Sequence, residues 1–128
     1  MKLTEVGALR AYARMMNTLD ASHIEPLLED NFRYSSQWML GELSSKQEFL
    51  AYIKPKLLAL KQSGGRAYAE IAIIQAWGHN ECVVTAQDEK ENLIATIFAH
   101  VKGKKIKRID MCNVPSPSEA MRTGEYPS

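Results

Sequence analysis

The spacing of apolar residues changes at Gly65, and this change constrains the fold more than any other feature of the chain. Before Gly65, apolar residues recur at the three- and four-residue intervals of one helix face. After Gly65 they alternate with polar residues, as in a strand with one buried face. This order predicts an α+β protein, in which a curved antiparallel sheet packs on about three helices of the N-terminal half.

The expected helices have start signals in the sequence. The first helix spans residues 4–19 and is apolar around most of its circumference, which is typical of a buried helix. Ser22 and Glu25 form a capping pair for a short second helix. Ser45 and Glu48 form a second capping pair, which predicts a long third helix.

The expected strands follow a different pattern. A short strand over residues 32–37 separates the second and third helices, with another short strand over 38–43. After Gly65 we expect a meander of antiparallel strands that ends in a tight hairpin. The strands of this meander span residues 66–77, 81–87, 93–102 and 105–113.

The length of 128 residues favours one domain with its own core. We expect this domain to span residues 1–113, and the Pro- and Ser-rich segment 114–128 to be a flexible tail. The net charge of +1 provides no global field that would attract nucleic acid. The lysine-rich run 102–108 is expected to solvate a turn, because no aromatic residue is interleaved with it.

The expected location is the cytoplasm, without a membrane anchor. We find no signal-peptide pattern and no apolar run long enough to span a bilayer. Cys82 and Cys112 are too few for a disulfide framework and are expected to be free, buried thiols. The histidines have no metal-ligand spacing and the chain has no phosphate-loop motif, so no metal and no cofactor are expected.

Four features, taken in order, resemble the NTF2-like superfamily, also called the SnoaL-like or ketosteroid-isomerase-like fold. They are the two opening helices, the segment LLEDNFRY, the capped helix SKQEFLAYI and the closing strand GKKIKRIDM. The resemblance covers residues 4–113. It implies a cone-shaped sheet around an apolar cavity, and frequent homodimerisation through the outer sheet face. It implies no single function, since this fold hosts isomerases, cyclases, dehydratases, transport factors and interaction domains.

The acids that the resemblance implies for an isomerase are missing from this chain. Isomerases of this fold carry an acidic base on the strand after the second helix, where residues 33–36 here read Arg-Tyr-Ser-Ser. Their second acid lies on the strand before the last, where residues 93–98 have no carboxylate. A serine has too high a pKa to replace the base without an activating partner. Ketosteroid-type proton transfer is therefore not expected.

Asp110 is the remaining candidate for a catalytic acid or base. It lies among aliphatic residues of the last strand, where burial can raise the pKa of a carboxyl group. The alternative is that Asp110 pairs with Arg108 or another basic residue. A two-residue turn at 103–104 would place His100 on the opposite face from Asp110. Only a β-bulge or an odd-length turn would bring His100 and Asp110 together.

The same regular register predicts that both faces of the last hairpin are apolar. Ile97 lies on one face with other aliphatic residues, and Phe98, Ile109 and Met111 lie on the other. An antiparallel sheet with one solvated face would alternate more cleanly. We therefore expect the helices to cover one face and a second copy of the chain to cover the outer face, as a homodimer.

The expected cavity is the candidate site for a small, mainly apolar ligand. Its wall would be apolar with a few hydroxyl and indole groups, which is typical of a small-molecule pocket. Alternatively, these side chains fill the core and satisfy their polar atoms on the backbone. The candidate ligand-binding residues are Tyr12, Met16, Tyr34, Ser36, Trp38, Ile53 and Leu57.

Three functions remain open from the sequence. The first is ligand binding without established catalysis, which needs a pocket of roughly 300 Å³ or more. The second is a SnoaL-like isomerase, cyclase or dehydratase, in which Asp110 would point into the cavity and Tyr12 or Tyr34 would donate hydrogen bonds. The third is a protein-interaction module with a vestigial cavity.

Overall fold

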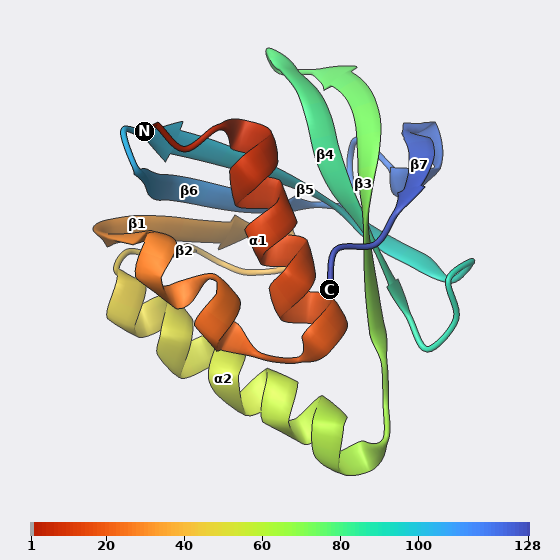
Figure 1. Ribbon diagram of the computed structural model, residues 1–128, viewed down its shortest axis with the longest axis horizontal. Coiled ribbons are helices and arrows are strands. Elements are labelled where there is room, and N and C mark those ends of the chain that lie inside the picture. The colour runs from red at the N-terminus through yellow and green to blue at the C-terminus, as the bar shows by residue number, and fades with distance from the viewer. Residues whose placement is uncertain (1) are drawn as a thin grey trace.

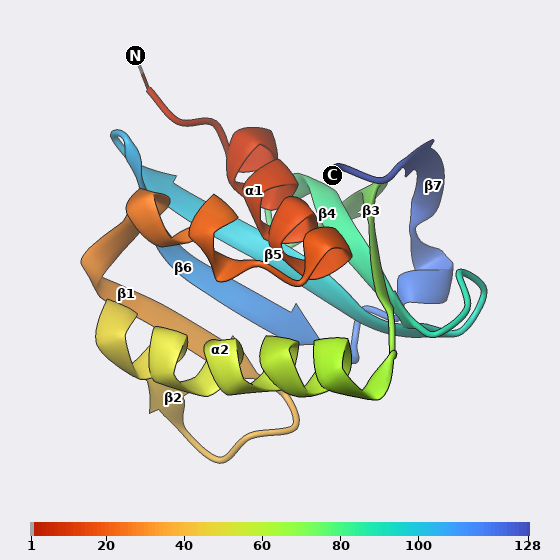
Figure 2. The same ribbon diagram turned by 60° about the horizontal axis from the view of Figure 1, so that its bottom comes forward.

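Two long helices cover one face of a seven-stranded curved sheet in the computed structural model, which describes residues 2–128 (Figures 1 and 2). The strand order is β2-β1-β6-β5-β4-β3-β7, and all neighbours are antiparallel except β1 and β6. The α+β cone is therefore confirmed, with one parallel pair in its sheet. The elements are α1 (Glu5–Thr18), β1 (Leu28–Ser36), β2 (Glu42–Leu43), α2 (Lys46–Ser63), β3 (Ala67–Ala76), β4 (His79–Gln87), β5 (Leu93–Lys102), β6 (Lys105–Cys112) and β7 (Met121–Glu125).

Side-chain caps determine where the two long helices begin. The Thr4 hydroxyl accepts a hydrogen bond from the Gly7 amide at the start of α1, 3.0 Å away. The Ser45 hydroxyl accepts one from the Glu48 amide at the start of α2, at 3.1 Å, as the capping pair predicts. α2 ends at Gly64, whose φ of 74° is in the left-handed region that glycine adopts without strain.

The expected second helix is replaced by two short 3₁₀ helices, Ala21–His23 and Glu25–Leu27. The cap is Asp20, whose carboxylate accepts from the Ser22 amide at 2.9 Å, so the predicted Ser22 cap is wrong. A proline at the start of the second 3₁₀ helix has no N–H for an α-helical bond. Strand β1 consequently begins four residues earlier than the predicted strand.

A β-bulge at Lys107 changes the register of the last hairpin. The turn at Gly103 and Lys104 pairs Val101 with Ile106 as predicted, but the register then shifts, so that Phe98 lies opposite Asp110. The regular register is therefore wrong beyond the bulge. The physical reason is burial, since Ile106 and Ile109 are both fully buried and only an extra residue between them lets both face the core.

Residues 114–128 are not a loose tail in the structure. They include a 3₁₀ helix at Pro117–Glu119 and strand β7, which pairs with the edge of β3 (Figure 1). Ala120 packs against a second, smaller apolar cluster on the outer sheet face. This segment therefore belongs to the same folded unit as residues 2–113. The buried members of the outer cluster are Ala72, Ile74, Cys82, Val84, Phe98 and Cys112.

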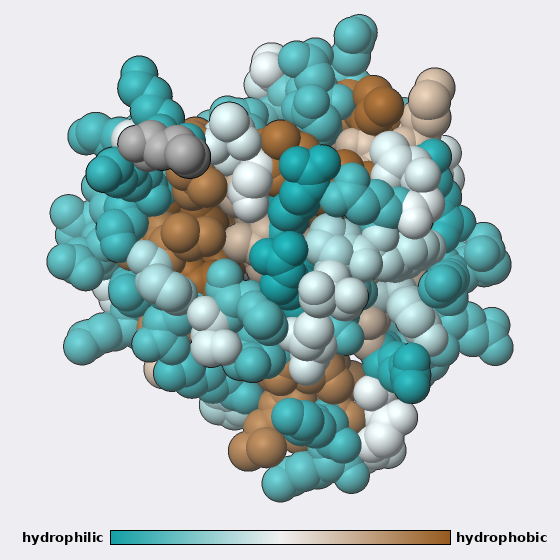
Figure 3. Space-filling view, viewed as in Figure 1, coloured by the Kyte–Doolittle hydropathy of each residue, from teal (hydrophilic) through white to brown (hydrophobic). Residues whose placement is uncertain are grey.

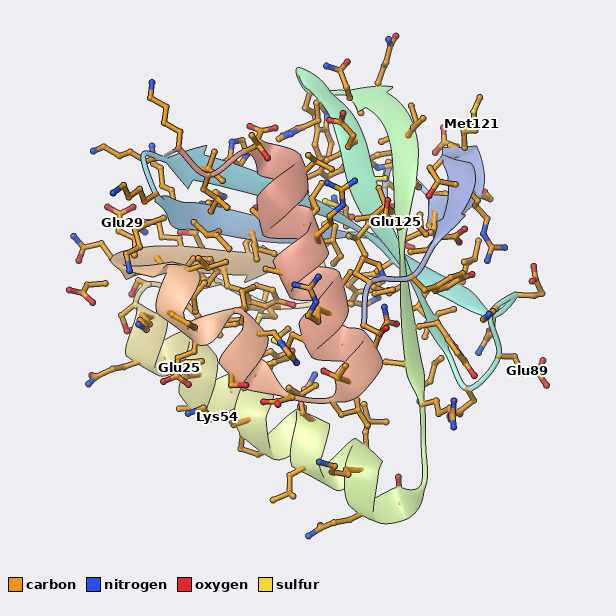
Figure 4. All side chains as sticks on the ribbon, in the orientation of Figure 1. Glu25, Glu29, Lys54, Glu89, Met121 and Glu125 are labelled. Carbon is orange, nitrogen blue, oxygen red and sulfur yellow. The ribbon has the colours of Figure 1, made fainter. Side chains whose placement is uncertain are left out.

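Ion pairs attach the peripheral segments to the helices. Arg10 of α1 binds Glu125 at the end of β7, with 2.7 Å between Nε and Oε2. Lys54 of α2 binds Glu25 of the 3₁₀ segment, with 3.0 Å between Nζ and Oε1. Figure 4 labels Glu25, Lys54 and Glu125 and shows that they come from separate elements. Such exposed pairs contribute about 0–1 kcal/mol each, so the buried cores hold the fold together.

Candidate functional site

A pocket of about 210 Å³ lies between α1, α2 and the sheet face that the helices cover, and we call it the tyrosine pocket. Five candidate residues of the sequence line it, namely Tyr12, Met16, Tyr34, Ile53 and Leu57. Its wall also includes residues that the sequence interpretation did not select, among them Tyr52, Lys56, Leu60, Ile94 and Met111.

The other two candidates, Ser36 and Trp38, do not line the tyrosine pocket. Strand β1 ends at Ser36, so Trp38 lies in the turn that follows, and 54% of Trp38 is exposed. The hydroxyl of Ser36 is buried and accepts a hydrogen bond from the Trp38 amide at 3.2 Å. Both residues therefore form part of the turn between β1 and β2.

Three tyrosines from three elements meet in the pocket. The ring of Tyr34 on β1 packs against the ring of Tyr52 on α2, with 5.7 Å between the centroids. The Tyr34 hydroxyl donates to Met111 Sδ at 3.3 Å, and Lys56 Nζ donates to the Tyr52 hydroxyl at 2.7 Å. Tyr12 of α1 is 3% exposed, and its hydroxyl makes no hydrogen bond with residues 2–128.

Burial keeps the two innermost tyrosines protonated. Desolvation raises the pKa of Tyr12 and of Tyr34 far above the ordinary tyrosine value, and the neighbouring hydroxyls raise both further. Tyr12 and Tyr34 are therefore neutral hydrogen-bond donors at any physiological pH. Tyr52 and Lys56 could have been found from the sequence, because both recur at helical spacing on the pocket face of α2.

The lining of the tyrosine pocket contains no carboxylate, and Lys56 is its single charged side chain. Such a wall can hold an apolar molecule and donate a hydrogen bond to a carbonyl or hydroxyl oxygen. It offers no acidic base for proton abstraction within the described residues.

Asp110 lies on the opposite, outer face of the sheet. Its Oδ1 accepts from the Ser35 hydroxyl at 2.6 Å and from Arg108 Nε at 2.9 Å. Nε2 of His100 is 3.7 Å from its Oδ2. From the sequence, only a bulge or an odd-length turn would bring His100 and Asp110 together, and the bulge at Lys107 does so. The two side chains meet on the outer face, away from the tyrosine pocket.

A network of charges surrounds Asp110. Arg108 also binds Glu42 of β2, with 2.6 Å between Nη2 and Oε2, and Arg33 binds the other oxygen of Glu42 at 3.0 Å. On the other side, His79 packs its ring 4.7 Å from that of His100 and approaches Glu5 Oε1 to 3.2 Å. Each carboxylate in this network has a basic partner, which matches the structural alternative for Asp110.

Residues 2–128 contain neither a candidate metal site nor a helix that could span a membrane. Among residues 2–128, no group of three or more His, Cys, Asp and Glu side chains could hold a metal ion. Within the same residues, no helix combines the length and apolar character needed to cross a bilayer.

Comparison with known proteins identifies the fold but not an activity. No family model and no curated protein matches the sequence. An NTF2-like protein of unknown function from Cytophaga hutchinsonii superposes with a TM-score of 0.62 at 13% identity, covering 92% of this chain and 96% of that one. A SnoaL-like protein of unknown function from Burkholderia thailandensis gives a TM-score of 0.60 at 18% identity, covering 97% and 100%.

A third similar structure is described both as NTF2-like and as having a cystatin-like fold. It is an NTF2-like protein with a cystatin-like fold from Novosphingobium aromaticivorans, with a TM-score of 0.51, 15% identity, and coverage of 90% of this chain and 84% of that one. At such identities the similarity concerns the fold alone.

Proposed function

We propose, from the premise that this chain has the NTF2-like fold, that it binds a small, mainly apolar molecule with a hydrogen-bond acceptor in the tyrosine pocket. The observation that carries the proposal is the Tyr12 hydroxyl, which lies in the mainly apolar lining of this pocket and makes no hydrogen bond with residues 2–128. Among residues 2–128, Thr96 Oγ1 is the only fully buried side-chain polar atom without a hydrogen-bond partner, so the Tyr12 hydroxyl reaches the pocket space and is free to donate to a ligand there.

The volume of the pocket limits the size of the ligand. An engineered apolar cavity of about 150 Å³ holds benzene. At about 210 Å³, the tyrosine pocket is smaller than the roughly 300 Å³ expected from the sequence for a ligand site, so it accommodates only a molecule with one ring and a carbonyl or hydroxyl group. Drug-sized ligands occupy pockets of about 300 Å³ and more, so a fused-ring compound would require the pocket to open.

A binding experiment with a one-ring ketone tests this proposal. Acetophenone is titrated into the protein while amide resonances are followed by NMR, in the wild type, in Tyr12→Phe and in the control Tyr68→Phe. We expect shifts at the amides around Tyr12 and Ile53. Loss of one neutral hydrogen bond should weaken binding by about three- to tenfold in Tyr12→Phe, and Tyr68→Phe should bind as the wild type does. Equal affinity of Tyr12→Phe and the wild type would contradict the role of Tyr12.

Catalysis is the second candidate function, and the structure gives it less support. An isomerase, cyclase or dehydratase would need an acid or base beside the ligand, whereas Asp110 points to the outer face. Ligand binding without acid–base chemistry therefore fits the described side chains better.

We also propose a homodimer through the outer sheet face. The regular register expected from the sequence placed Ile109 and Met111 on the outer face with Phe98, as support for a dimer. The bulge turns both residues toward the helices, so the outer face of the hairpin is less apolar than expected. Its remaining support is Trp77, which is 64% exposed while its ring packs 5.5 Å from that of Phe98. Light scattering would measure the mass, and we expect Trp77→Ala to shift a dimer to the monomer while Trp38→Ala does not. A monomeric wild type at high concentration would refute the dimer.

An interaction module remains the third candidate, supported by the same exposed tryptophan.

For location, we propose the cytoplasm, on the support of two free cysteines that are both buried. Cell fractionation would test this location, and recovery of the protein outside the cytoplasm would contradict it.

A further inference from the structure

A second pocket, of about 600 Å³, lies where the C-terminal ends of α1 and α2 meet the start of β3, and we call it the basic pocket. Its wall comes from distant parts of the chain, since Lys90 of the β4–β5 turn and Tyr126 also line it. The amide of Asn17 closes one side by donating to the carbonyl oxygens of Ala69 and Pro127, at 2.8 and 2.7 Å. In Figure 3, teal and white residues lie beside brown ones at the lower edge of the molecule, where α2 meets β3.

The charged side chains in the wall of the basic pocket are all positive. They are Lys61, Arg66 and Lys90, and none of them forms an ion pair with residues 2–128. This distinguishes them from Arg10, Arg33, Arg108 and Arg122, each of which binds a carboxylate. Unpaired cations around one cavity create a positive potential that favours an anion.

Negative groups near the basic pocket reduce this potential. Asp88 accepts a hydrogen bond from the Arg66 amide at 3.2 Å. The charge of Lys61 is also felt by Asp20, whose pKa is lowered mainly by its hydrogen bonds to Ser22. The C-terminal ends of α1 and α2 each contribute about half a negative charge. The pocket wall contains no Asp or Glu side chain, but it includes the last residue of the sequence, Ser128, whose negative carboxylate accepts a hydrogen bond from Arg14 Nε at 3.4 Å.

Two tyrosine rings hold Lys90 in place over the basic pocket. Its ammonium lies 4.5 Å from the ring centroid of Tyr126 and 5.8 Å from that of Tyr68. The two rings pack edge to face, with 6.3 Å between their centroids. Cation–π contacts of this kind restrict an otherwise flexible lysine, so less entropy is lost when a ligand binds.

We propose that the basic pocket binds a small organic anion, with a phosphate or carboxylate group held by Lys61, Arg66 and Lys90. The organic part follows from the volume, which exceeds that of an inorganic anion, and from the ring surfaces of Tyr68 and Tyr126 in the wall. The basic and tyrosine pockets share Ala67 as a wall residue but no polar side chain. A failure of anion binding in the basic pocket would therefore leave the proposal for the tyrosine pocket intact, and the reverse also holds.

Three probes distinguish the parts of the ligand. Phenyl phosphate, inorganic phosphate and benzyl alcohol are titrated separately into the full chain, and amide resonances are followed by NMR. With phenyl phosphate we expect shifts confined to residues 64–68, Lys90 and Tyr126. Inorganic phosphate should bind more weakly at the same amides, and benzyl alcohol should not shift them. A neutral probe that binds as well as the anion, or phosphate alone that binds as well as phenyl phosphate, would overturn the proposed ligand class.

Charge-removing variants test the site itself. Lys90→Ala and Arg66→Ala lie on the surface and should fold normally, and each should bind phenyl phosphate roughly tenfold more weakly through the loss of one charge-assisted contact. Lys104→Ala removes the same charge from the exposed β5–β6 turn, outside the pocket, and should leave the affinity unchanged. Similar losses of affinity in all three variants would show only non-specific attraction to positive charge and would refute the site. An absence of amide shifts in the wild type at millimolar phenyl phosphate would also refute it.

Discussion

Nε2 of His100 lies 3.7 Å from Oδ2 of Asp110, on the sheet face that points away from the long helices. The other oxygen of Asp110 accepts hydrogen bonds from Ser35 and Arg108. The Asp110 side chain is 20% exposed, so its contacts are partly shielded from solvent. Asp110 thus connects β6 to both of its neighbours, β1 and β5, three residues beyond the bulge at Lys107.

Asp110→Asn should therefore lower the stability of the protein. The amide keeps one acceptor oxygen but loses the charge that Arg108 faces, and a hydrogen bond to a charged group contributes about 1.5–3 kcal/mol. We expect the free energy of unfolding to fall by about 2 kcal/mol, as measured by urea denaturation at pH 7. Asp30→Asn is the matched control, because Asp30 is exposed on β1 without an ion pair, and it should change stability by less than about 0.5 kcal/mol. Equal effects of the two variants would contradict a structural role for Asp110.

The buried tyrosines predict a loss of stability at alkaline pH. The pKa values of Tyr12 and Tyr34 are raised in the folded protein, so the unfolded chain releases these protons first. Their contribution is fully present below about pH 10, the ordinary tyrosine pKa, and is lost as the pH rises toward the folded values. Each of the two tyrosines should reduce the free energy of unfolding by about 1.4 kcal/mol per pH unit in that range.

Urea denaturation between about pH 10.5 and pH 12 would measure this slope. Tyr12→Phe removes one of the two groups and should therefore lose stability less steeply than the wild type by about 1.4 kcal/mol per pH unit. Absorbance at 295 nm gives an independent check, since Tyr12 and Tyr34 should resist ionisation until the protein unfolds, while the pKa of Tyr126 is also raised by its burial. An identical slope in Tyr12→Phe would show that Tyr12 ionises normally in the folded state.

The parts of the fold that were predictable depend on local signals. Ser45 and Glu48 lie within one helical turn and cap α2 whatever surrounds them. The Gly103–Lys104 turn is likewise determined by adjacent residues. The bulge at Lys107 is different, because it is favoured only once Ile106 and Ile109 share a core with the helices.

Residues of the candidate site were predicted correctly where the helix or strand that carries them was predicted correctly. Tyr12, Tyr34 and Ile53 lie on core faces that the hydrophobic spacing identifies, and they meet in the pocket. Trp38 was placed by assuming that β1 continues past Ser36, whereas the strand ends there. The C-terminal segment was expected to be loose because it is rich in Pro and Ser. Its order depends instead on Glu70, which binds Arg122 from 52 residues away. Such distant pairing leaves no local sequence pattern.

The two cysteines should react slowly in the folded protein. Burial raises the pKa of Cys82 to about 12, and burial together with the charge of Asp110 raises that of Cys112 to about 11. Since the thiolate is the reactive form, we expect both thiols to react with a disulfide reagent at pH 8 at least about a hundredfold more slowly than free cysteine. The same protein in concentrated urea should label both thiols quickly. Fast labelling of either thiol without denaturant would show that the outer cluster opens readily.

Glu70 determines whether the C-terminal segment stays on the sheet. Its carboxylate is 4% exposed and accepts from Arg122 Nε at 2.6 Å, from the Gly124 amide at 2.7 Å and from the Tyr126 hydroxyl at 3.2 Å. Removing its charge leaves Arg122 and Gly124 poorly satisfied next to a buried neutral amide. We therefore expect Glu70→Gln to lower the free energy of unfolding by about 2–3 kcal/mol, and to speed hydrogen exchange at Gly124 of β7 before β3 is affected.

Glu91→Gln provides a matched control, because Glu91 binds the same arginine, with 2.9 Å between Oε2 and Arg122 Nη1, but is 82% exposed. An exposed ion pair contributes at most about 1 kcal/mol, so Glu91→Gln should leave both the stability and the Gly124 exchange rate close to those of the wild type. If the two variants behaved alike, burial of Glu70 would not be what holds β7 against β3. If Glu70→Gln unfolded the whole chain without first releasing Gly124, the segment would be part of one cooperative core.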